Sequence, residues 1–171
     1  MTASVYPPVE SEAQLMLSSF GQASVRVTPL QMAMVSAAIA NGGTLMRPTL
    51  VDSVVAPDLS VLEAVEPSVY GTPISPETAA AMTAMMVQNV ANGAASNARI
   101  EGVSVAGKTG TAENGPGEPY TLWFTGFAPA DDPRIAVAVV IENGGGQGQA
   151  GFGNTVAAPI AREVIEAVLG R

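Results

Sequence analysis

The sequence predicts an α+β fold, and three observations carry this prediction. Three segments of strand character follow one another in the last third of the chain, with only short connections between them. Strands joined in this way pair antiparallel, because a parallel pair needs a crossover of a dozen or more residues. Two earlier segments open with the Ser-Pro or Thr-Pro sequence that starts helices. The chain of 171 residues is 47% apolar and 13% charged, which indicates a packed core in one domain or in part of a larger one.

Three helices are expected from their capping residues and their apolar spacing. The first follows Thr28-Pro29 and ends at the Asn-Gly-Gly of 41–43, and the second follows Ser75-Pro76 and ends at Asn92-Gly93. In both, a hydroxyl caps the first turn, proline occupies a position that needs no N–H, and glycine follows the last turn. A third helix is expected from about Thr155 to Leu169, because apolar side chains recur there on one face.

Five strands are expected from β-branched and aromatic residues bounded by turn residues. Thr49–Val55 and Ser60–Val65 flank an Ala-Pro-Asp turn and predict a small peripheral hairpin. Val103–Thr111, Tyr120–Phe127 and Arg134–Glu142 predict an antiparallel meander, the three C-terminal strands of a sheet packed with helices.

The last of these strands has a pattern of its own. Residues 135–141 are apolar at every position, which is typical of a strand buried on both faces and paired on both edges. A meander that ends on this strand leaves one apolar edge unpaired, an aggregation hazard that natural proteins avoid. We therefore expect further strands, missing from this chain, beside 134–142.

Composition excludes several classes of chemistry and of partner. The net charge is −8 and the six arginines are scattered, so neither nucleic acid nor an anionic membrane surface is expected as the main partner. Without histidine or cysteine, the chain has no imidazole base, thiolate or nitrogen or sulfur metal ligand, and neither a metal nor a cofactor is expected. No apolar run approaches the ~20 residues of a membrane-spanning helix, and no secretory leader is evident near Met1.

Two glycine motifs spell phosphate-binding sites. Gly102–Thr109 matches G-x-x-x-x-G-K-[ST]. A phosphate-binding loop of this pattern needs a helix that begins directly after it, and the glycines and prolines of 110–119 cannot form one. Gly146–Gly151 matches G-x-G-x-x-G, but the chain ends before the second parallel strand and the acidic residue that a dinucleotide site needs. We expect the first match to be coincidental and the second to be a mobile surface loop, with a nucleotide-binding protein as the alternative.

The single lysine of the chain, Lys108, is expected at the end of a strand that lines a cleft. A strand places Lys108 and Gly110 on one face and Thr109 and Thr111 on the other. Glycine at 110 lets a ligand backbone approach closely, and the two hydroxyls beside an ammonium suit a carboxylate. The alternative is a surface lysine on an ordinary strand.

From about Leu17 onward, the chain resembles the C-terminal half of the transpeptidase domain of penicillin-binding proteins. It is most similar to the monofunctional class B enzymes, in particular the actinobacterial penicillin-binding protein A branch. The resemblance rests on segments that follow one another in family order: Ser19–Gln22, Val27–Ala33, Ile39–Gly43, Ala106–Glu113, Trp123–Pro129 and Ala157–Ile160.

This resemblance implies a fold of the serine β-lactamase and penicillin-binding transpeptidase type, and a site built from three motifs, S-x-x-K, S-x-N and K-[ST]-G. Lys108 would add positive field to the cleft, and Thr109 would bind the terminal carboxylate of a peptidoglycan stem peptide or of a β-lactam. Gly110 would leave room for the ligand. The backbone N–H of Thr111 would form half of the oxyanion hole.

The chain departs from the family in lacking the nucleophile. Residue 105 is valine, so Lys108 completes no S-x-x-K, and no asparagine follows a serine by two positions. We therefore expect residues 1–171 to be the C-terminal portion of a single transpeptidase domain, whose N-terminal portion carries both absent motifs. This chain alone would be inactive. The complete protein would work at the extracytoplasmic face of the membrane, held there through an N-terminal anchor absent from this chain, and a non-catalytic interaction domain is the remaining alternative.

Overall fold

The computed structural model describes residues 3–171, which form four α-helices, seven short or medium strands and three 3₁₀ turns. The helices are α1 (Glu12–Ser19), α2 (Pro29–Ala40), α3 (Pro76–Asn92) and α4 (Gly153–Leu169). The strands are β1 (Leu45–Met46), β2 (Ser53–Val55), β3 (Val61–Ala64), β4 (Val69–Gly71), β5 (Ala106–Ala112), β6 (Thr121–Ala128) and β7 (Ile135–Ile141). The 3₁₀ turns are η1 (Ser96–Ala98), η2 (Asn143–Gly146) and η3 (Gly148–Ala150).

The three C-terminal strands form an antiparallel sheet in the order β5-β6-β7, as the sequence predicts. Its register pairs Lys108 with Thr125 and Thr125 with Ala138. β5 begins at Ala106, three residues later than expected, because Ile100 and Val103 close a tight bridge of their own before it. The α+β prediction is confirmed.

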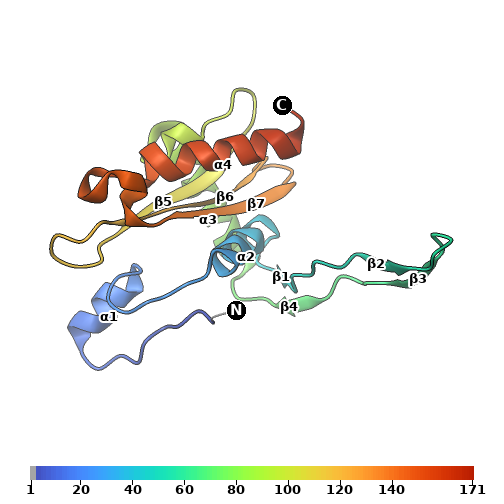
Figure 1. Ribbon diagram of the computed structural model, residues 1–171, viewed down its shortest axis with the longest axis horizontal. Coiled ribbons are helices and arrows are strands. Elements are labelled where there is room, and N and C mark those ends of the chain that lie inside the picture. The colour runs from blue at the N-terminus through green and yellow to red at the C-terminus, as the bar shows by residue number, and fades with distance from the viewer. Residues whose placement is uncertain (1–2) are drawn as a thin grey trace.

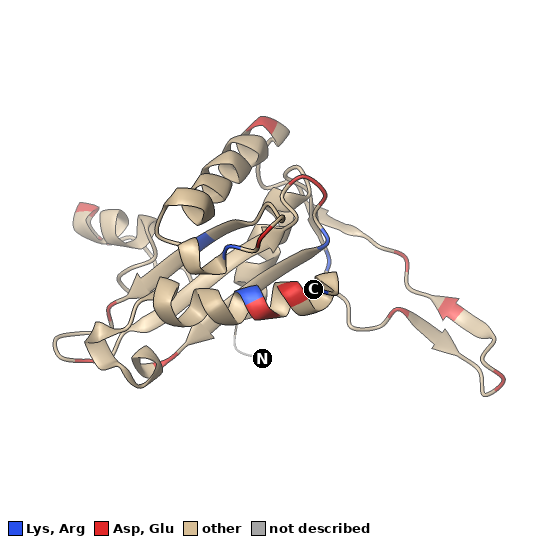
Figure 2. Ribbon diagram, turned by 90° about the horizontal axis from the view of Figure 1, so that it is seen from above, with Lys and Arg blue, Asp and Glu red and all other residues tan. Residues whose placement is uncertain are grey.

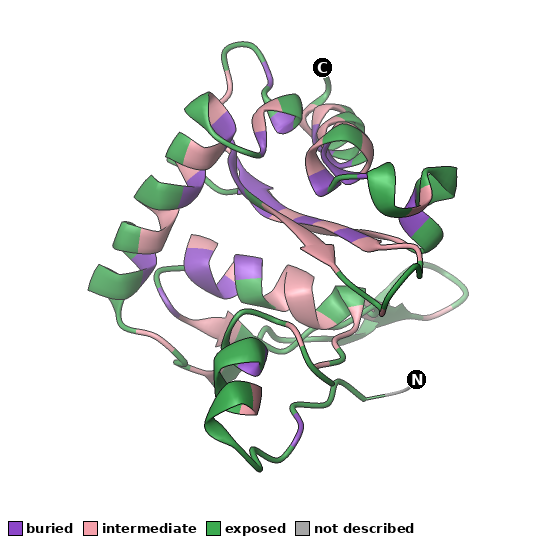
Figure 3. Cartoon of the chain, turned by 90° about the vertical axis from the view of Figure 1, so that its left-hand side faces the viewer, coloured by how far each residue is buried: buried purple, intermediate pink, exposed green. Residues whose placement is uncertain are grey.

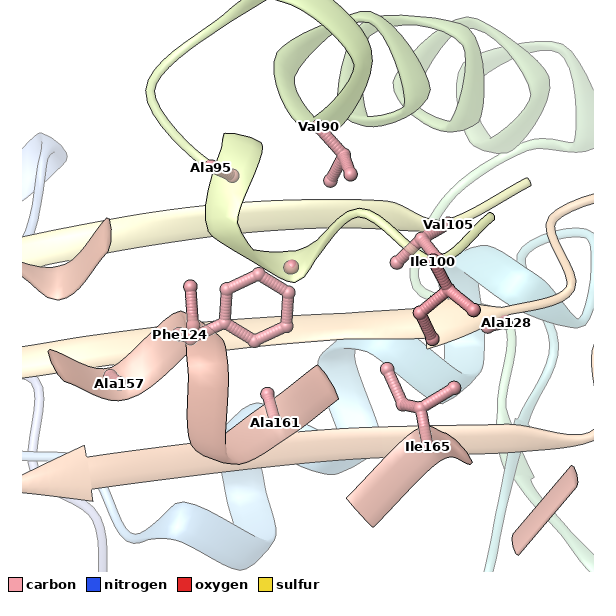
Figure 4. Close-up of a cluster of buried hydrophobic side chains, with 11 residues drawn as sticks. Val90, Ala95, Ile100, Val105, Phe124, Ala128, Ala157, Ala161 and Ile165 are labelled. Atoms are coloured by element: carbon pink, nitrogen blue, oxygen red, sulfur yellow. The ribbon is translucent and has the colours of Figure 1, made fainter. Parts of the chain in front are cut away.

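Helices cover both faces of this sheet, with α4 on one face, α2 on the other and α3 beside β5 (Figure 1). The core under α4 joins Phe124 of β6 to Ala157, Ala161 and Ile165 of the helix, all of them fully buried (Figure 4). Alanine at the contact lets α4 approach the sheet closely, and Phe124 fills the remaining volume. A smaller core of four residues joins α2 and α3 to the sheet: Ile39, Met86, Ala106 and Phe127. The inner sides of the helices and the sheet are thus buried, while the outer sides are exposed (Figure 3).

The predicted helices are confirmed by their caps. Thr28 accepts a hydrogen bond from the N–H of Gln31, and Ser75 accepts one from the N–H of Thr78. α4 begins at Gly153, slightly earlier than expected and without a side-chain cap. One helix was not predicted: α1, a helix of eight residues capped by Ser11. Its length gives the apolar pattern only two turns in which to appear.

Residues 45–71 leave the body of the molecule as a long two-stranded arm (Figure 1). The outer hairpin of β2 and β3 confirms the predicted one, whereas the inner pair of β1 and β4 was not predicted. Most of the arm's apolar side chains are exposed, and acidic residues follow it to its tip (Figure 2). The arm is therefore a surface feature and adds little to the core.

The strand β7 is an edge strand within residues 3–171. It pairs only with β6, and all seven of its residues are half-buried. The burial expected from its continuous apolar run is thus incomplete here, because the second edge has no covering strand among the described residues. In the same part of the chain, no helix is long and apolar enough to cross a membrane.

Candidate active-site wall

Lys108 is the third of the seven residues of β5, so it lies near the middle of the strand, not at its end as expected and not at the start of a helix. The strand continues to Ala112, so the helix that a phosphate loop requires directly after Gly107 does not form. The nucleotide-binding alternative at 102–109 is therefore wrong. Residues 143–150 form two 3₁₀ turns between β7 and α4. Because β7 pairs antiparallel with β6, the parallel βαβ unit of a dinucleotide site is likewise absent from the described chain.

The peptide groups of β5 alternate between the sheet and its outer edge. The side-chain amide of Asn89 on α3 donates a 2.9 Å hydrogen bond to the carbonyl of Gly107, which shows that this carbonyl points away from β6. In an antiparallel pair, every second residue directs both its N–H and its C=O to the same edge. Thr109 and Thr111 therefore present their backbone groups at the outer edge, where no strand pairs with them within residues 3–171.

Side chains of the same segment alternate between the two faces of the sheet. Lys108 and Gly110 share a face with their cross-strand partners Thr125 and Trp123. The Thr109 hydroxyl, on the other face, donates to the carbonyl of Ala94 over 3.2 Å. That of Thr111 accepts a long bond from the N–H of Gly153 at 3.4 Å. Both hydroxyls thus have a backbone partner in this structure.

A cleft of about 620 Å³ opens beside β5. One wall is β5 itself, and the other is the irregular segment that joins α1 to α2. Four half-buried or exposed residues also line it, on β6 and beside the strand ends: Asn114, Thr121, Trp123 and Thr125. The structure therefore brings Lys108, Thr109, Gly110 and Thr111 together on one side of a single cavity, as the sequence predicts for a cleft-lining strand.

The cleft is more cationic than the rest of the molecule. It holds Lys108 and Arg26, two of the seven cationic residues of a chain with 15 acidic ones, and a single carboxylate, that of Glu142. Lys108 is exposed, and its ammonium donates to the carbonyl of Thr109. Among residues 3–171, no group of three His, Cys, Asp or Glu side chains is placed to hold a metal ion. The arrangement suits recognition of an anionic ligand by charge and by backbone hydrogen bonds.

Sequence reasoning missed the far wall and the floor of this cleft. Phe20, Gln22 and Arg26 line the wall opposite β5, and Trp123 and Thr125 line the floor. A signal was available, because the segments 19–22 and 123–129 both carry the family resemblance. The residues were not assigned to the site, since only the fold brings these distant segments beside Lys108.

The family model described as penicillin-binding protein transpeptidase domain matches residues 2–166. The chain therefore belongs to the penicillin-binding protein transpeptidase family. Its fold is that of the penicillin-binding transpeptidases, which are related to the serine β-lactamases.

Two curated relatives show which members of the family the chain is similar to. The chain is similar to the peptidoglycan D,D-transpeptidase PbpA of Mycolicibacterium smegmatis, with 44% identity over 167 residues, 95% of this chain and 33% of the relative. It is 38% identical over 154 residues to stage V sporulation protein D of Bacillus subtilis, covering 86% of this chain and 23% of the relative. The chain thus spans about a third or less of the length of these curated relatives.

Solved structures agree. Penicillin-binding protein A of Mycobacterium tuberculosis, as its ceftriaxone acyl-enzyme complex, superposes with a TM-score of 0.90 at 42% identity. The match covers 97% of this chain and 38% of that one. The likeness thus extends over nearly all of this chain and a minor part of the relative.

Proposed function

We propose that residues 1–171 are the C-terminal portion of a single transpeptidase domain. Two surfaces support the proposal besides the lengths of the relatives. The outer edge of β7 carries seven half-buried apolar residues without a partner strand in the described chain. On α1, Leu15, Met16 and Leu17 are exposed. Apolar edges and helix faces of this kind are covered in native proteins, and the N-terminal portion of the domain would cover them.

Within that domain, the segment Lys108–Thr111 forms one wall of a peptidoglycan D,D-transpeptidase site. The outer-edge position of the Thr111 N–H is the observation that carries this assignment, because an unpaired strand N–H is a ready donor for an oxyanion. Lys108 supplies positive charge, and Thr109 binds the terminal carboxylate of a stem peptide or of a β-lactam. Gly110 has no side chain to obstruct the ligand.

The reaction is acyl transfer through a serine of the N-terminal portion. The serine oxygen adds to the carbonyl of the penultimate D-alanine, and the resulting oxyanion lies against the Thr111 N–H. Collapse expels the terminal D-alanine as an amine, which takes a proton, and leaves an acyl-serine. An acceptor amine of a second stem peptide then displaces the serine and forms the cross-link. A β-lactam follows the first step only, because its leaving nitrogen stays attached to the acyl group.

The setting of this reaction follows from its substrate. Peptidoglycan lies outside the cytoplasm, so the domain acts at the outer face of the cytoplasmic membrane. Any membrane attachment would come from an N-terminal anchor outside residues 1–171. Neither nucleic acid nor a cofactor takes part.

A fluorescent penicillin tests the proposal directly. The test protein is the complete domain, in which residues 1–171 follow an N-terminal portion carrying S-x-x-K and S-x-N. That portion comes from the gene upstream of Met1 or, as a chimaera, from the M. smegmatis relative. We expect a stoichiometric adduct that survives denaturation with the complete domain, and none with residues 1–171 alone, which lack the activated serine.

A pair of substitutions then tests the role of Thr111. Thr111→Pro removes the backbone N–H at an edge position, where the sheet loses no ladder bond, and should lower the acylation rate about 10²-fold or more. Thr111→Ala keeps the N–H and is the matched control, with an expected loss of a few-fold. Equal rates for the two variants would remove Thr111 from the oxyanion hole. An adduct on residues 1–171 alone would refute the proposed division of the domain.

A further inference from the structure

Ser36 is a fully buried polar residue in an otherwise apolar helix. Its neighbours along α2 are alanine, methionine, valine and isoleucine, and only it and Ser18 are buried polar residues within the described chain. A buried hydroxyl is costly unless it is hydrogen-bonded. The position of its partner therefore shows what the residue holds together.

That partner is Thr125, at the centre of the sheet. The two hydroxyl oxygens lie 2.6 Å apart. The Thr125 oxygen is also 3.1 Å from the carbonyl of Met32 on α2 and 3.2 Å from that of Val137 on β7. Either hydroxyl can donate in the contact between Ser36 and Thr125. When Ser36 donates, Thr125 keeps its single proton for one of the two carbonyls. The Thr125 side chain thus joins β6 to α2.

Thr125 is also the direct neighbour of Lys108 on the adjacent strand. The two residues are register partners on the same face. Since Gly107 turns its carbonyl to the outer edge, its neighbour Lys108 directs both backbone groups to β6 and exchanges them with Thr125. The backbone of Lys108 is therefore fixed to the residue whose side chain is anchored on α2.

The same anchor reaches the opposite wall of the cleft. α2 begins directly after the segment that forms this wall, and both Met32 and Thr125 line the cavity itself. A shift of α2 against β6 would therefore change the distance between Lys108 and the far wall. The hydrogen bond between the hydroxyls of Ser36 and Thr125 spans this helix–sheet contact.

We propose that Thr125, held by Ser36, is a positioning residue for acyl transfer, which fixes Lys108 and the width of the cleft relative to the acylated serine. This inference rests on the proposed function. Thr125 contacts no reacting atom, and its contribution is geometric: a displacement of about 1 Å at a reacting centre can cost up to 10²-fold in rate.

The experiment measures two quantities on the complete domain with fluorescent penicillin: the fraction of protein labelled at saturation, and the acylation rate constant of that fraction. Thr125→Val keeps the shape and removes the hydroxyl. A structural role alone would lower the labelled fraction and the melting temperature. A positioning role lowers the rate constant of the labelled protein, and we expect about a tenfold decrease. Thr125→Ser restores the hydroxyl and should return the rate to within about twofold of the original.

Thr83→Val is the matched control. The Thr83 hydroxyl also donates to a backbone carbonyl, that of Ala79 at 2.9 Å, but on α3 and outside the cleft lining. Its loss should leave the rate constant unchanged. Ser36→Ala is a milder test, with about a threefold decrease, because Thr125 keeps its carbonyl acceptors.

The outcomes separate the two proposals. Absence of any adduct on the unsubstituted complete domain refutes the proposed function. A normal adduct together with a Thr125→Val rate constant no lower than that of Thr83→Val refutes the positioning role alone, as does failure of Thr125→Ser to restore the rate. If Thr125→Val does not fold, Ser36→Ala decides: a lowered rate constant supports the role, and an unchanged one overturns it.

Discussion

Asn89 donates its side-chain amide to the carbonyl of Gly107 over 2.9 Å and so joins the last turn of α3 to the outer edge of β5. Its side-chain oxygen accepts from the N–H of Ala94 at 3.1 Å, which folds the following loop back on the helix. Ala94 in turn supplies the carbonyl that receives the Thr109 hydroxyl. The Asn89 side chain thus occupies the outer edge of β5 at Gly107. It also positions the loop residue Ala94, which contacts Thr109 where the unpaired edge begins.

Replacing Asn89 by alanine should therefore destabilise the domain. The substitution leaves the Gly107 carbonyl and the Ala94 N–H without their partners, and we expect the free energy of unfolding to fall by about 1–3 kcal/mol. Denaturant unfolding of the complete domain measures this loss. Asn92→Ala is the control, because Asn92 bonds only the exposed side chain of Gln88, and a change within about 0.5 kcal/mol is expected. Equal losses for the two variants would show that Asn89 does not hold the edge.

Elements with strong local signals could be predicted from the sequence. The caps at Thr28 and Ser75 bond only to their own first turns, so four or five residues contain the whole signal. The meander could be predicted as well, since short turns leave only antiparallel pairing. The K-T-G strand differs from a phosphate loop in residues 110–119, because their glycines and prolines cannot form the helix that a phosphate loop needs.

The rest depends on contacts between distant segments. β1 pairs with β4 through two residues on each side of the arm, too few to show an alternating pattern. The hydroxyl bond between Ser36 and Thr125 joins residues 89 positions apart, and nothing near either residue indicates the other. The far wall of the cleft has no regular structure from Gly21 to Val27, so no periodicity could have placed it.

A substitution at Gly153 tests how closely α4 must pack on β5, the strand that carries Lys108. A Cβ atom at this position would lie 2.5 Å from the carbonyl oxygen of Trp123 and 2.8 Å from that of Gly110. Helix propensity alone predicts that alanine stabilises the first turn of α4 by up to about 1 kcal/mol. The clash with two backbone oxygens opposes this gain, and overpacking of this kind typically costs about 1–3 kcal/mol. We expect Gly153→Ala to lower both the free energy of unfolding and the acylation rate constant of the complete domain.

Gly71→Ala is the comparison for that variant. Nothing lies within 4 Å of a Cβ atom added at Gly71, on β4 of the arm. Its melting temperature and acylation should match those of the original protein. A Gly153→Ala protein as stable and as reactive as Gly71→Ala would mean that α4 can move off β5 without cost.

The lowered pKa of Glu77 predicts a small dependence of stability on pH. A hydrogen bond from the Ser75 hydroxyl, followed by one from its own backbone N–H, lowers the pKa of this carboxyl in the first turn of α3. A folded-state pKa below the unfolded one means that ionisation favours the folded state. This stabilisation is present above the ordinary carboxyl pKa and is lost as the pH falls through the folded-state value. Glu77→Gln should therefore lower the melting temperature near neutral pH and have no effect well below about pH 4.

Asp58 provides the contrast. Its pKa is lowered chiefly by a hydrogen bond from the side chain of Ser60, but the residue lies at the tip of the arm. We expect Asp58→Asn to leave the melting temperature of the complete domain unchanged at every pH. A loss for Asp58→Asn equal to that for Glu77→Gln would show that opening of the arm is coupled to unfolding of the body.

Shortening the arm tests the same independence directly. Leu59 and Leu62 are 79% and 68% exposed, so the hairpin that carries them buries little apolar area on the body. Replacing residues 51–65 by an Asn-Gly turn keeps β1, β4 and the stacking of Arg47 on Tyr70. Because hydrophobic stabilisation scales with buried apolar area, thermal unfolding of the complete domain should shift by no more than about 2 °C. Removing exposed leucines should also reduce aggregation. A decrease of about 5 °C or more would instead show that the N-terminal portion of the domain packs on the arm and covers those leucines.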